Sequence, residues 1–242
     1  MSSTNQHFPE SGTRRRLGEP KHQKPRDRKF PPMSLHLLII AATGGLGTNL
    51  VLEALARGHT VSVLVRNADK LPPDVRSKLS NVHIGSGDDI NAVKNALTGV
   101  DVVVSGAPAN PDIAKTLAEQ TKASSARKLV WVAGASNMLE ADGTLHHLSF
   151  GPGGQMYYDA HKPCIDAVAA SGCKFVVFCP PLMGARGSKS SPLPSIAVRA
   201  HRGGSGFLSY EDAAWAMIKA AEVDEFDGQL ITAYAEPVNR DL

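Results

Sequence analysis

The sequence predicts an α/β protein built on a doubly wound parallel sheet. From Leu35 onward, short runs rich in β-branched residues alternate with segments of helical periodicity, which is typical of βαβ units. The runs are continuously apolar, as in strands buried on both faces of a sheet. The first run also leads directly into a glycine-rich turn and a helical segment. Together these observations indicate a Rossmann-type sheet.

The expected elements follow one another in regular alternation along a single domain, residues 34–242. Within the helical segments, apolar residues recur three or four positions apart, for example at Leu50 and Ala54 or at Ile113 and Leu117, and give each helix one apolar face. The expected strands are residues 35–41, 60–65, 81–85, 100–105, 128–133, 174–178 and 229–233, and the expected helices are residues 46–57, 89–98, 112–125, about 160–171 and 210–222.

Two long segments, 134–160 and 180–206, lack a clear periodicity and are rich in Gly, Pro and Ser. Loops of this length in a compact domain are usually functional. Both segments follow the carboxyl end of a predicted strand, the edge at which open α/β sheets bind their ligands. We therefore interpret them as substrate loops.

The charge of the chain is unevenly distributed. The formal net charge is +3, but residues 1–33 contain eight basic and three acidic residues, which leaves 18 basic and 20 acidic residues for the rest. The basic excess thus belongs to the N-terminal segment, and we expect neither nucleic acid nor a membrane surface as a partner. The expected partner is a small-molecule substrate, and no pattern specifies an oligomeric state.

Residues 1–33 are predicted to be a disordered basic extension, because they combine five prolines with few apolar side chains. They lack the apolar stretch of a secretory signal, and their prolines and acidic residues argue against the alternative of a mitochondrial presequence. Met33 is an alternative start. The apolar run 35–42 is far shorter than the ~20 residues of a membrane span. We expect a soluble, cytoplasmic protein.

The three cysteines are Cys164, Cys173 and Cys179. Their number is odd and no two form a C-x-x-C pair, which favours a reducing compartment over a disulfide or zinc framework. We interpret them as buried or half-buried thiols without a chemical role.

The turn after the first strand reads Ala-Ala-Thr-Gly-Gly-Leu-Gly, from Ala41 to Gly47. Glycines at such a turn let the backbone approach a pyrophosphate, which the N-terminus of the next helix binds through its free N–H groups. Ala41 stands where the first glycine of the pattern is expected, and its Cβ can crowd the turn or the cofactor. The residues expected to bind the dinucleotide here are Ala42, Thr43, Gly44, Gly45, Leu46 and Gly47.

The end of the second strand indicates which dinucleotide binds. An NAD-binding protein usually has an acidic residue there for the ribose hydroxyls, whereas this chain has Arg66, which can pair with the 2′-phosphate of NADP(H). We therefore expect NADP(H) in preference to NAD(H), with Lys70 adding charge. Asp88 either contacts the adenine edge or is a carboxylate at a helix N-terminus. Gly106 and Ala107, which follow the fourth strand, are also expected at the cofactor.

Three stretches resemble a known family: the segment from Ile39 to Asn67, residues 171–184 (SGCKFVVFCPPLMG) and residues 208–229 (LSYEDAAWAMIKAAEVDEFDGQ). They are similar to the NAD(P)H-binding, atypical short-chain dehydrogenase/reductase group, which includes flavin reductase/biliverdin-IXβ reductase and NmrA-like proteins. The likeness covers nearly all of residues 35–235. It implies a single domain that binds NADPH at the carboxyl edge of the sheet and passes hydride to a planar acceptor.

Candidate catalytic residues follow the fifth strand. Tyr158 and Lys162 have the i, i+4 spacing with which many short-chain dehydrogenases lower the pKa of a tyrosine, and Ser136 is the matching serine. Pro163 argues against a helical turn at Lys162, so pocket lining or surface remains the alternative for the pair. The resemblance to flavin and biliverdin reductases implies instead that orientation of the acceptor suffices, with His161 gating or touching it.

Metal chemistry is not expected. His146 and His147 can be grouped with His161, but no carboxylate or cysteine completes a recognisable ligand spacing.

Three functions are compatible with these residues. The first is an NADPH-dependent oxidoreductase that transfers hydride to a planar or carbonyl-type acceptor such as a flavin, tetrapyrrole or quinone. The second is a non-catalytic NADP(H)-binding redox sensor of the NmrA-like type, which Ala41 and the doubtful Tyr158/Lys162 pair favour. The third is an isomerase or dehydratase that uses the nucleotide transiently.

Overall fold

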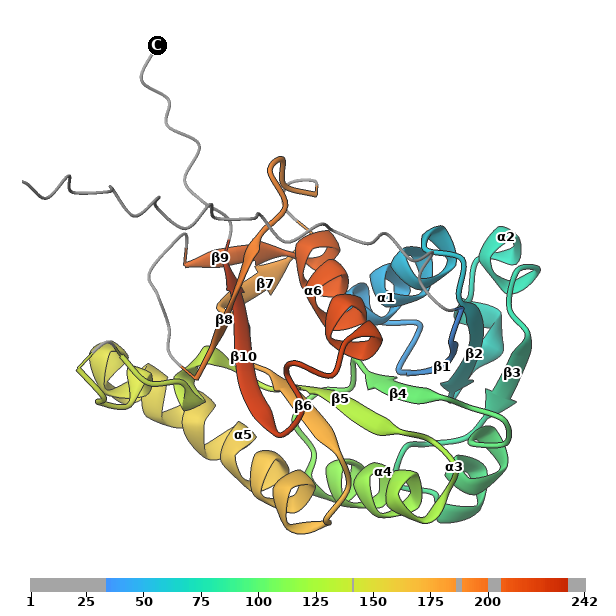
Figure 1. Ribbon diagram of the computed structural model, residues 1–242, viewed down its shortest axis with the longest axis horizontal. Helices are drawn as coiled ribbons and strands as arrows, with labels where there is room; N and C mark the ends of the chain where they lie inside the picture. The colour runs from blue at the N-terminus through green and yellow to red at the C-terminus, as the bar shows by residue number, and fades with distance from the viewer. Residues whose placement is uncertain (1–33, 141, 186–188, 200–205, 235–242) are drawn as a thin grey trace, which may run out of the picture. The chain divides into compact units, whose positions relative to one another are not determined.

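A computed structural model describes residues 34–140, 142–185, 189–199 and 206–234 (Figure 1). The chain divides into two units, Met1–Pro32 and Met33–Leu242, and all described residues belong to the second. The predicted N-terminal extension therefore lies outside the described residues.

The core of the protein is an eight-stranded sheet in the order β3-β2-β1-β4-β5-β6-β10-β8. All neighbouring strands are parallel except β8, which runs antiparallel to β10 at one edge. The predicted α/β fold class is confirmed, and each expected strand is present. The strands are β1 (His36–Ile40), β2 (Thr60–Val65), β3 (Asn81–Ile84), β4 (Val102–Ser105), β5 (Lys128–Val132), β6 (Phe175–Phe178), β8 (Ser195–Val198) and β10 (Gln229–Tyr234).

The segment 180–206 is not the continuous loop that the sequence predicts. It contains β7 (Leu182–Gly184) and β8, and β7 pairs in parallel with β9 (Phe207–Ser209) in a small second sheet. These strands have three or four residues each, too few for an alternation of apolar and polar residues to stand out among the prolines and serines.

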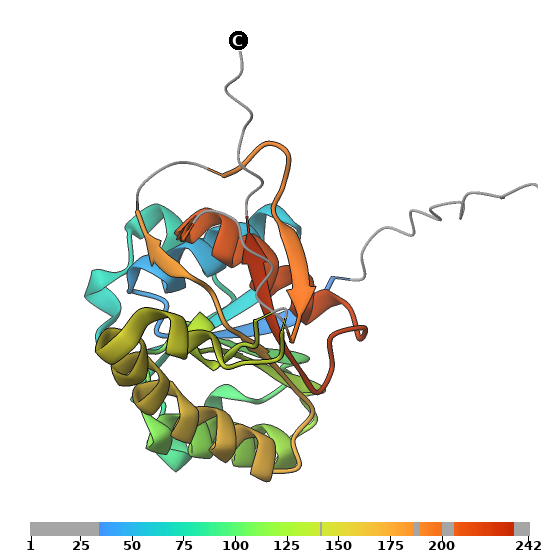
Figure 2. The same ribbon diagram turned by 90° about the vertical axis from the view of Figure 1, so that its left-hand side faces the viewer.

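Helices cover both faces of the large sheet. The helices α1 and α6 pack on one face, while α3, α4 and α5 cover the other (Figure 1). The view turned by 90° shows α5 running along its face, opposite α6 (Figure 2). The helices are α1 (Gly45–Ala56), α2 (Pro73–Arg76), α3 (Ile90–Ala96), α4 (Pro111–Ala123), α5 (Gly151–Ala170) and α6 (Tyr210–Glu222), with 3₁₀ turns η1 (Ala68–Lys70), η2 (Ala135–Asn137) and η3 (His146–Phe150).

Helix α5 is longer than the sequence predicts, because it begins at Gly151 rather than near residue 160 and runs through Pro163. The expectation that Pro163 ends the helical turn is wrong. Proline lacks the N–H that would bond the carbonyl of Asp159, but both residues are exposed, so water can solvate that carbonyl. The buried residues Cys164, Ile165 and Val168 hold this part of the helix on the sheet.

The motif Asp-Glu-Phe-Asp-Gly, residues 224–228, has a structural role. It receives the ammonium group of Lys128, a buried residue at the start of β5, which lies 2.8 Å from Asp227 and 3.2 Å from Asp224. The same group donates to the Val223 carbonyl at 2.5 Å. A buried ammonium group needs hydrogen-bond acceptors. These contacts therefore fix the turn at the amino end of β5, away from the carboxyl ends of the strands.

The three free cysteines are buried, as predicted. Burial raises the pKa of Cys173 to about 11 and also raises the pKa of Cys164 and Cys179. These thiols are therefore protonated at neutral pH and are poor nucleophiles.

The turn between β1 and α1 depends on a close backbone approach. Ala41 has a φ of 59° and its carbonyl accepts from the N–H of Gly44 at 3.1 Å. A Cβ at Gly47 would lie 2.0 Å from that same carbonyl oxygen. The crowding expected at Ala41 is therefore a strained backbone: its left-handed conformation costs an alanine about 1–2 kcal/mol.

We predict that Gly47→Ala destabilises the protein by about 1–3 kcal/mol, because its Cβ meets backbone atoms that cannot move aside. Gly44→Ala is the matched control. A Cβ at Gly44 lies at an ordinary 3.5 Å from the Ala41 oxygen, so its effect should stay within about 0.5 kcal/mol. Urea unfolding measures both, and similar losses for the two variants would contradict the prediction.

Candidate active site

The amino end of α1 has the features of an anion-binding site. Side chains cap three other helices: Asp89 caps α3, Asn110 caps α4 and Ser209 caps α6. Helix α1 has Gly44 at this position, without a side-chain hydrogen bond and without an acidic residue in its first turn. Its first N–H groups and the positive end of its dipole are therefore available to a phosphate.

This helix end lies at the reversal point of the sheet. Strands β1 and β4 are neighbours, with Ile40 opposite Ser105 at their carboxyl ends. The chain winds outward in both directions from this pair, and open α/β sheets bind their ligands in a crevice at such a point. Gly106 lies here, since a Cβ there would lie 3.3 Å from the Gly47 nitrogen, and the buried Ala107 follows.

The remaining predicted cofactor residues take different places. Thr43 is half-buried in the turn, whereas Ala42 and Leu46 are buried in the core and can offer only backbone groups to a ligand. Arg66 is exposed at the end of β2, and Lys70 is exposed in η1. Asp88 is exposed and does not cap α3, because its neighbour Asp89 does.

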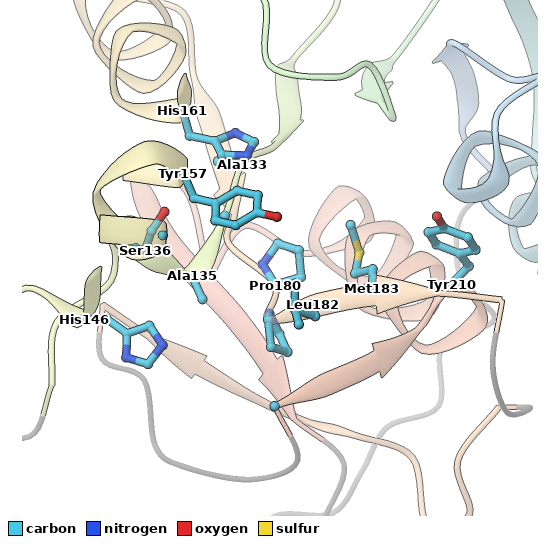
Figure 3. Close-up of a pocket in the computed structure, with 15 residues that line it drawn as sticks. Ala133, Ala135, Ser136, His146, Tyr157, His161, Pro180, Leu182, Met183 and Tyr210 are labelled. Atoms are coloured by element: carbon cyan, nitrogen blue, oxygen red, sulfur yellow. The ribbon is translucent and has the colours of Figure 1, made fainter. Parts of the chain in front are cut away.

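A cavity of about 520 Å³ opens next to this crevice (Figure 3). It lies beyond the carboxyl ends of β5 and β6, and its walls come from the segment 133–136, the first turns of α5, the segment 180–183 and the start of α6. Pro180, Leu182 and Met183 form an apolar wall, and the hydroxyl of Tyr157 points into the space. Such a site suits a largely apolar small molecule.

Tyr210 connects the cavity to the glycine-rich turn. It lines the cavity, and a Cβ at Gly45 would lie 2.5 Å from its ring. The Tyr210 ring is therefore a boundary that the glycine-rich turn and the cavity share.

Ser136 and His161, two of the candidate catalytic residues, both line the cavity. They flank Gly134, whose Cβ would be 3.0 Å from the His161 ring and 3.5 Å from the Ser136 hydroxyl. Burial lowers the pKa of His161, and within the described part of the chain its Nδ1 has no hydrogen-bond partner. The ring is thus a neutral imidazole near pH 7.

The structure does not bring Tyr158 and Lys162 into the cavity, although both lie on α5. The Tyr158 ring packs on His147 at 4.2 Å between ring centroids. The Lys162 ammonium bonds both carboxylate oxygens of Asp166, at 2.5 and 2.6 Å, and this hydrogen bonding raises the pKa of Lys162. Helical periodicity explains the outcome, because the cavity side of α5 carries Tyr157 and His161, which are also four residues apart.

The sequence analysis missed a carboxylate and imidazole pair, Glu140 and His146. The His146 ring lines the cavity and its Nδ1 lies 2.5 Å from a Glu140 carboxylate oxygen. A bridge between Leu139 and Leu145 brings them together around a tight turn with Gly143 at a φ of 85°. The Asp142-Gly143 dipeptide is a hairpin signal that could have predicted this turn.

Within the described ranges, no three His, Cys, Asp or Glu side chains gather in a way that could hold a metal ion. His147 packs on Tyr158 and does not line the cavity that His146 and His161 line. None of the described helices is both long and apolar enough to cross a membrane.

Comparisons with known proteins agree with a dinucleotide site at the turn between β1 and α1. A family model described as NAD(P)H-binding matches residues 41–222. A bifunctional pinoresinol-lariciresinol reductase from Forsythia intermedia is 38% identical over 76 residues, which span 28% of this chain and only 24% of that reductase. The chain therefore matches about a quarter of that relative's length.

Solved structures share the fold. One is a wide-type short-chain dehydrogenase/reductase from Veillonella parvula DSM 2008 in complex with NADP, with a TM-score of 0.70, 16% identity, and 84% of this chain and 95% of that chain covered. Another is an anaerobillin reductase from Escherichia coli O157:H7, with a TM-score of 0.67, 16% identity, and 86% and 98% covered.

We predict that His161→Asn reduces the fall in the free energy of unfolding at acid pH. Because burial lowers the pKa of His161 from its ordinary 6.5, the unfolded chain takes up a proton below that pH while the folded protein does not. The free energy of unfolding of the natural protein therefore falls as the pH drops below 6.5 towards the folded-state pKa. Urea unfolding at about pH 7.5 and about pH 5.5 should show a smaller loss for the variant. Equal losses would contradict a buried, neutral ring.

Proposed function

The chain belongs to the NAD(P)H-binding family, and from that premise we propose that it is an NADPH-dependent reductase that transfers hydride to a planar small-molecule acceptor. The observation that carries the proposal is the cavity, which adjoins the phosphate-binding turn through Tyr210 and has room for an acceptor beside a nicotinamide. A flavin, a linear tetrapyrrole and a quinone all fit its apolar, flat character.

The residues present suit a dinucleotide. The uncapped amino end of α1 would bind the pyrophosphate, and Gly106 leaves room beside it. When bound, NADPH supplies the hydride. The protein's own contribution is orientation, because the Pro180 and Met183 side chains hold a flat acceptor and exclude water, while the Ser136 hydroxyl can donate to it.

The preference for NADP(H) over NAD(H) rests on Arg66. Its guanidinium group stands exposed at the end of β2, one strand away from the glycine-rich turn. A guanidinium group can bond a 2′-phosphate through two parallel hydrogen bonds, whereas it gains little from a ribose hydroxyl.

The proposed activity is tested by incubating the full chain with NADPH and, separately, riboflavin, FMN, biliverdin and menadione. We expect loss of the nicotinamide absorbance band with at least one of them. Tight NADPH binding without consumption in the presence of any acceptor would rule out the reductase.

We predict that Arg66→Gln weakens NADPH binding about 10- to 100-fold, the value of a charge-assisted pair of hydrogen bonds, and leaves NADH binding within about threefold. Titration of each nucleotide by fluorescence measures this. Arg76→Gln, at an exposed position of α2, is the control and should change neither affinity. Equal weakening for both nucleotides would mean that Arg66 does not contact the 2′-phosphate.

A second candidate is a redox sensor that binds NADP(H) without turnover. It is favoured by the separation of Tyr158 and Lys162 from the cavity, which removes the usual acid of short-chain dehydrogenases. A sensor would bind a protein partner in a cofactor-dependent way. Partner binding that is the same with NADPH, with NADP⁺ and without nucleotide would argue against it.

A further inference from the structure

The cavity has two chemically different ends. At the nucleotide end, the Tyr210 ring lies against Gly45 of the phosphate-binding turn. His146 lines the opposite side, with Tyr157 and Pro180 between them (Figure 3). An acceptor in this space therefore has one edge towards the dinucleotide and another towards an imidazole ring.

His146 is held in place by a carboxylate. Its Nδ1 lies 2.5 Å from a Glu140 oxygen, which also accepts from the Ser149 hydroxyl at 3.3 Å. Only 9% of the His146 side chain is exposed. Because the carboxylate fixes the Nδ1 edge of the ring, the opposite edge with Nε2 is directed to the cavity that the ring lines. A carboxylate–imidazole pair of this kind is a standard device for moving a proton.

The other imidazole of the cavity is less suited to that task. His161 has no carboxylate partner among the described residues, and burial lowers its pKa so that the ring is neutral. Among the described residues, the titratable groups that line the cavity or belong to residues 140–162 beside His146 are Glu140, Asp142, His147, Tyr157, Tyr158, Asp159, His161, Lys162 and Tyr210.

We propose that His146, oriented by Glu140, delivers the proton to the far end of a conjugated acceptor whose near end takes up the hydride. This step rests on the proposed reductase function. The C–H bond at C4 of the nicotinamide breaks, and its electron pair forms a new bond at the near end of the acceptor. The displaced π electrons move to an oxygen or nitrogen at the far end, which takes the Nε2 proton of doubly protonated His146. NADPH is oxidised, the acceptor gains two electrons, and solvent reprotonates the ring.

The separation of the two ends defines the class of substrate. Reduction of an isolated ketone places hydride and proton on the adjacent atoms of one C=O bond. A quinone, an enone, an isoalloxazine or a linear tetrapyrrole accepts them on atoms that lie apart and are joined by conjugation. The cavity, with Tyr210 on one side and His146 on the other, suits this second class.

The test uses His146→Gln with two acceptors in single turnovers of the NADPH complex. Menadione needs a proton as well as hydride, whereas the 10-methylacridinium cation becomes neutral on hydride uptake alone. We expect menadione reduction to slow by about 10²–10⁴-fold, while acridinium reduction, corrected for the uncatalysed reaction, and NADPH affinity stay unchanged.

Two further variants separate proton delivery from packing. Glu140→Gln should reduce the menadione rate less than His146→Gln does and leave the acridinium rate unchanged, as expected for a residue that positions His146. His147→Phe keeps the stacking on Tyr158 and should leave both rates unchanged.

The outcomes are distinct. Equal losses with the two acceptors, or an unchanged menadione rate in His146→Gln, would overturn proton delivery by His146. If the natural protein binds NADPH but reduces neither acceptor, the proposed reductase function itself fails.

Discussion

The contact between Gly47 and the Ala41 carbonyl fixes the position from which the rest of the site is built. It brings the first turn of α1 against the end of β1, so that the uncapped N–H groups of the helix face the crevice between β1 and β4. The phosphate site is thus made of backbone, and its position depends on the absence of side-chain atoms rather than on any functional group. The left-handed backbone of Ala41 is a cost that the packing of this turn offsets.

The position of the cavity depends on that turn, because α6 contacts the turn and also forms part of the cavity wall. Tyr210, the first residue of α6, rests on Gly45, and buried Asp212 in the same turn accepts from the backbone and hydroxyl of Ser190 at 2.8 and 2.6 Å. At the other end of α6, Glu222 pairs with Arg57 and His59. Because both ends of the helix are held by partly buried polar contacts, Tyr210 is a fixed wall between the nucleotide crevice and the cavity.

The two sides of the cavity differ in origin. The nucleotide side comes from strand ends and helix starts of the sheet, whereas the far side comes from the segment 134–150 and the first turns of α5. The second side carries the polar groups that can act on an acceptor. Side chains on connecting segments can change without disturbing the core, so the far side of the cavity can vary while the sheet stays the same.

The sequence by itself determined the sheet, the glycine-rich turn between β1 and α1 and the burial of the cysteines, because continuous apolar strands and a glycine-rich turn are local patterns. Ser136 and His161, which the sequence suggested as catalytic candidates, both line the cavity. Only the tertiary structure decided that Tyr157 rather than Tyr158 faces that space, since the direction of each side chain depends on how α5 packs on the sheet. The Glu140–His146 pair likewise depends on a hairpin and a 3₁₀ turn docking beside α5. Contacts of this kind join residues without a periodic spacing, and so they leave no pattern along the chain.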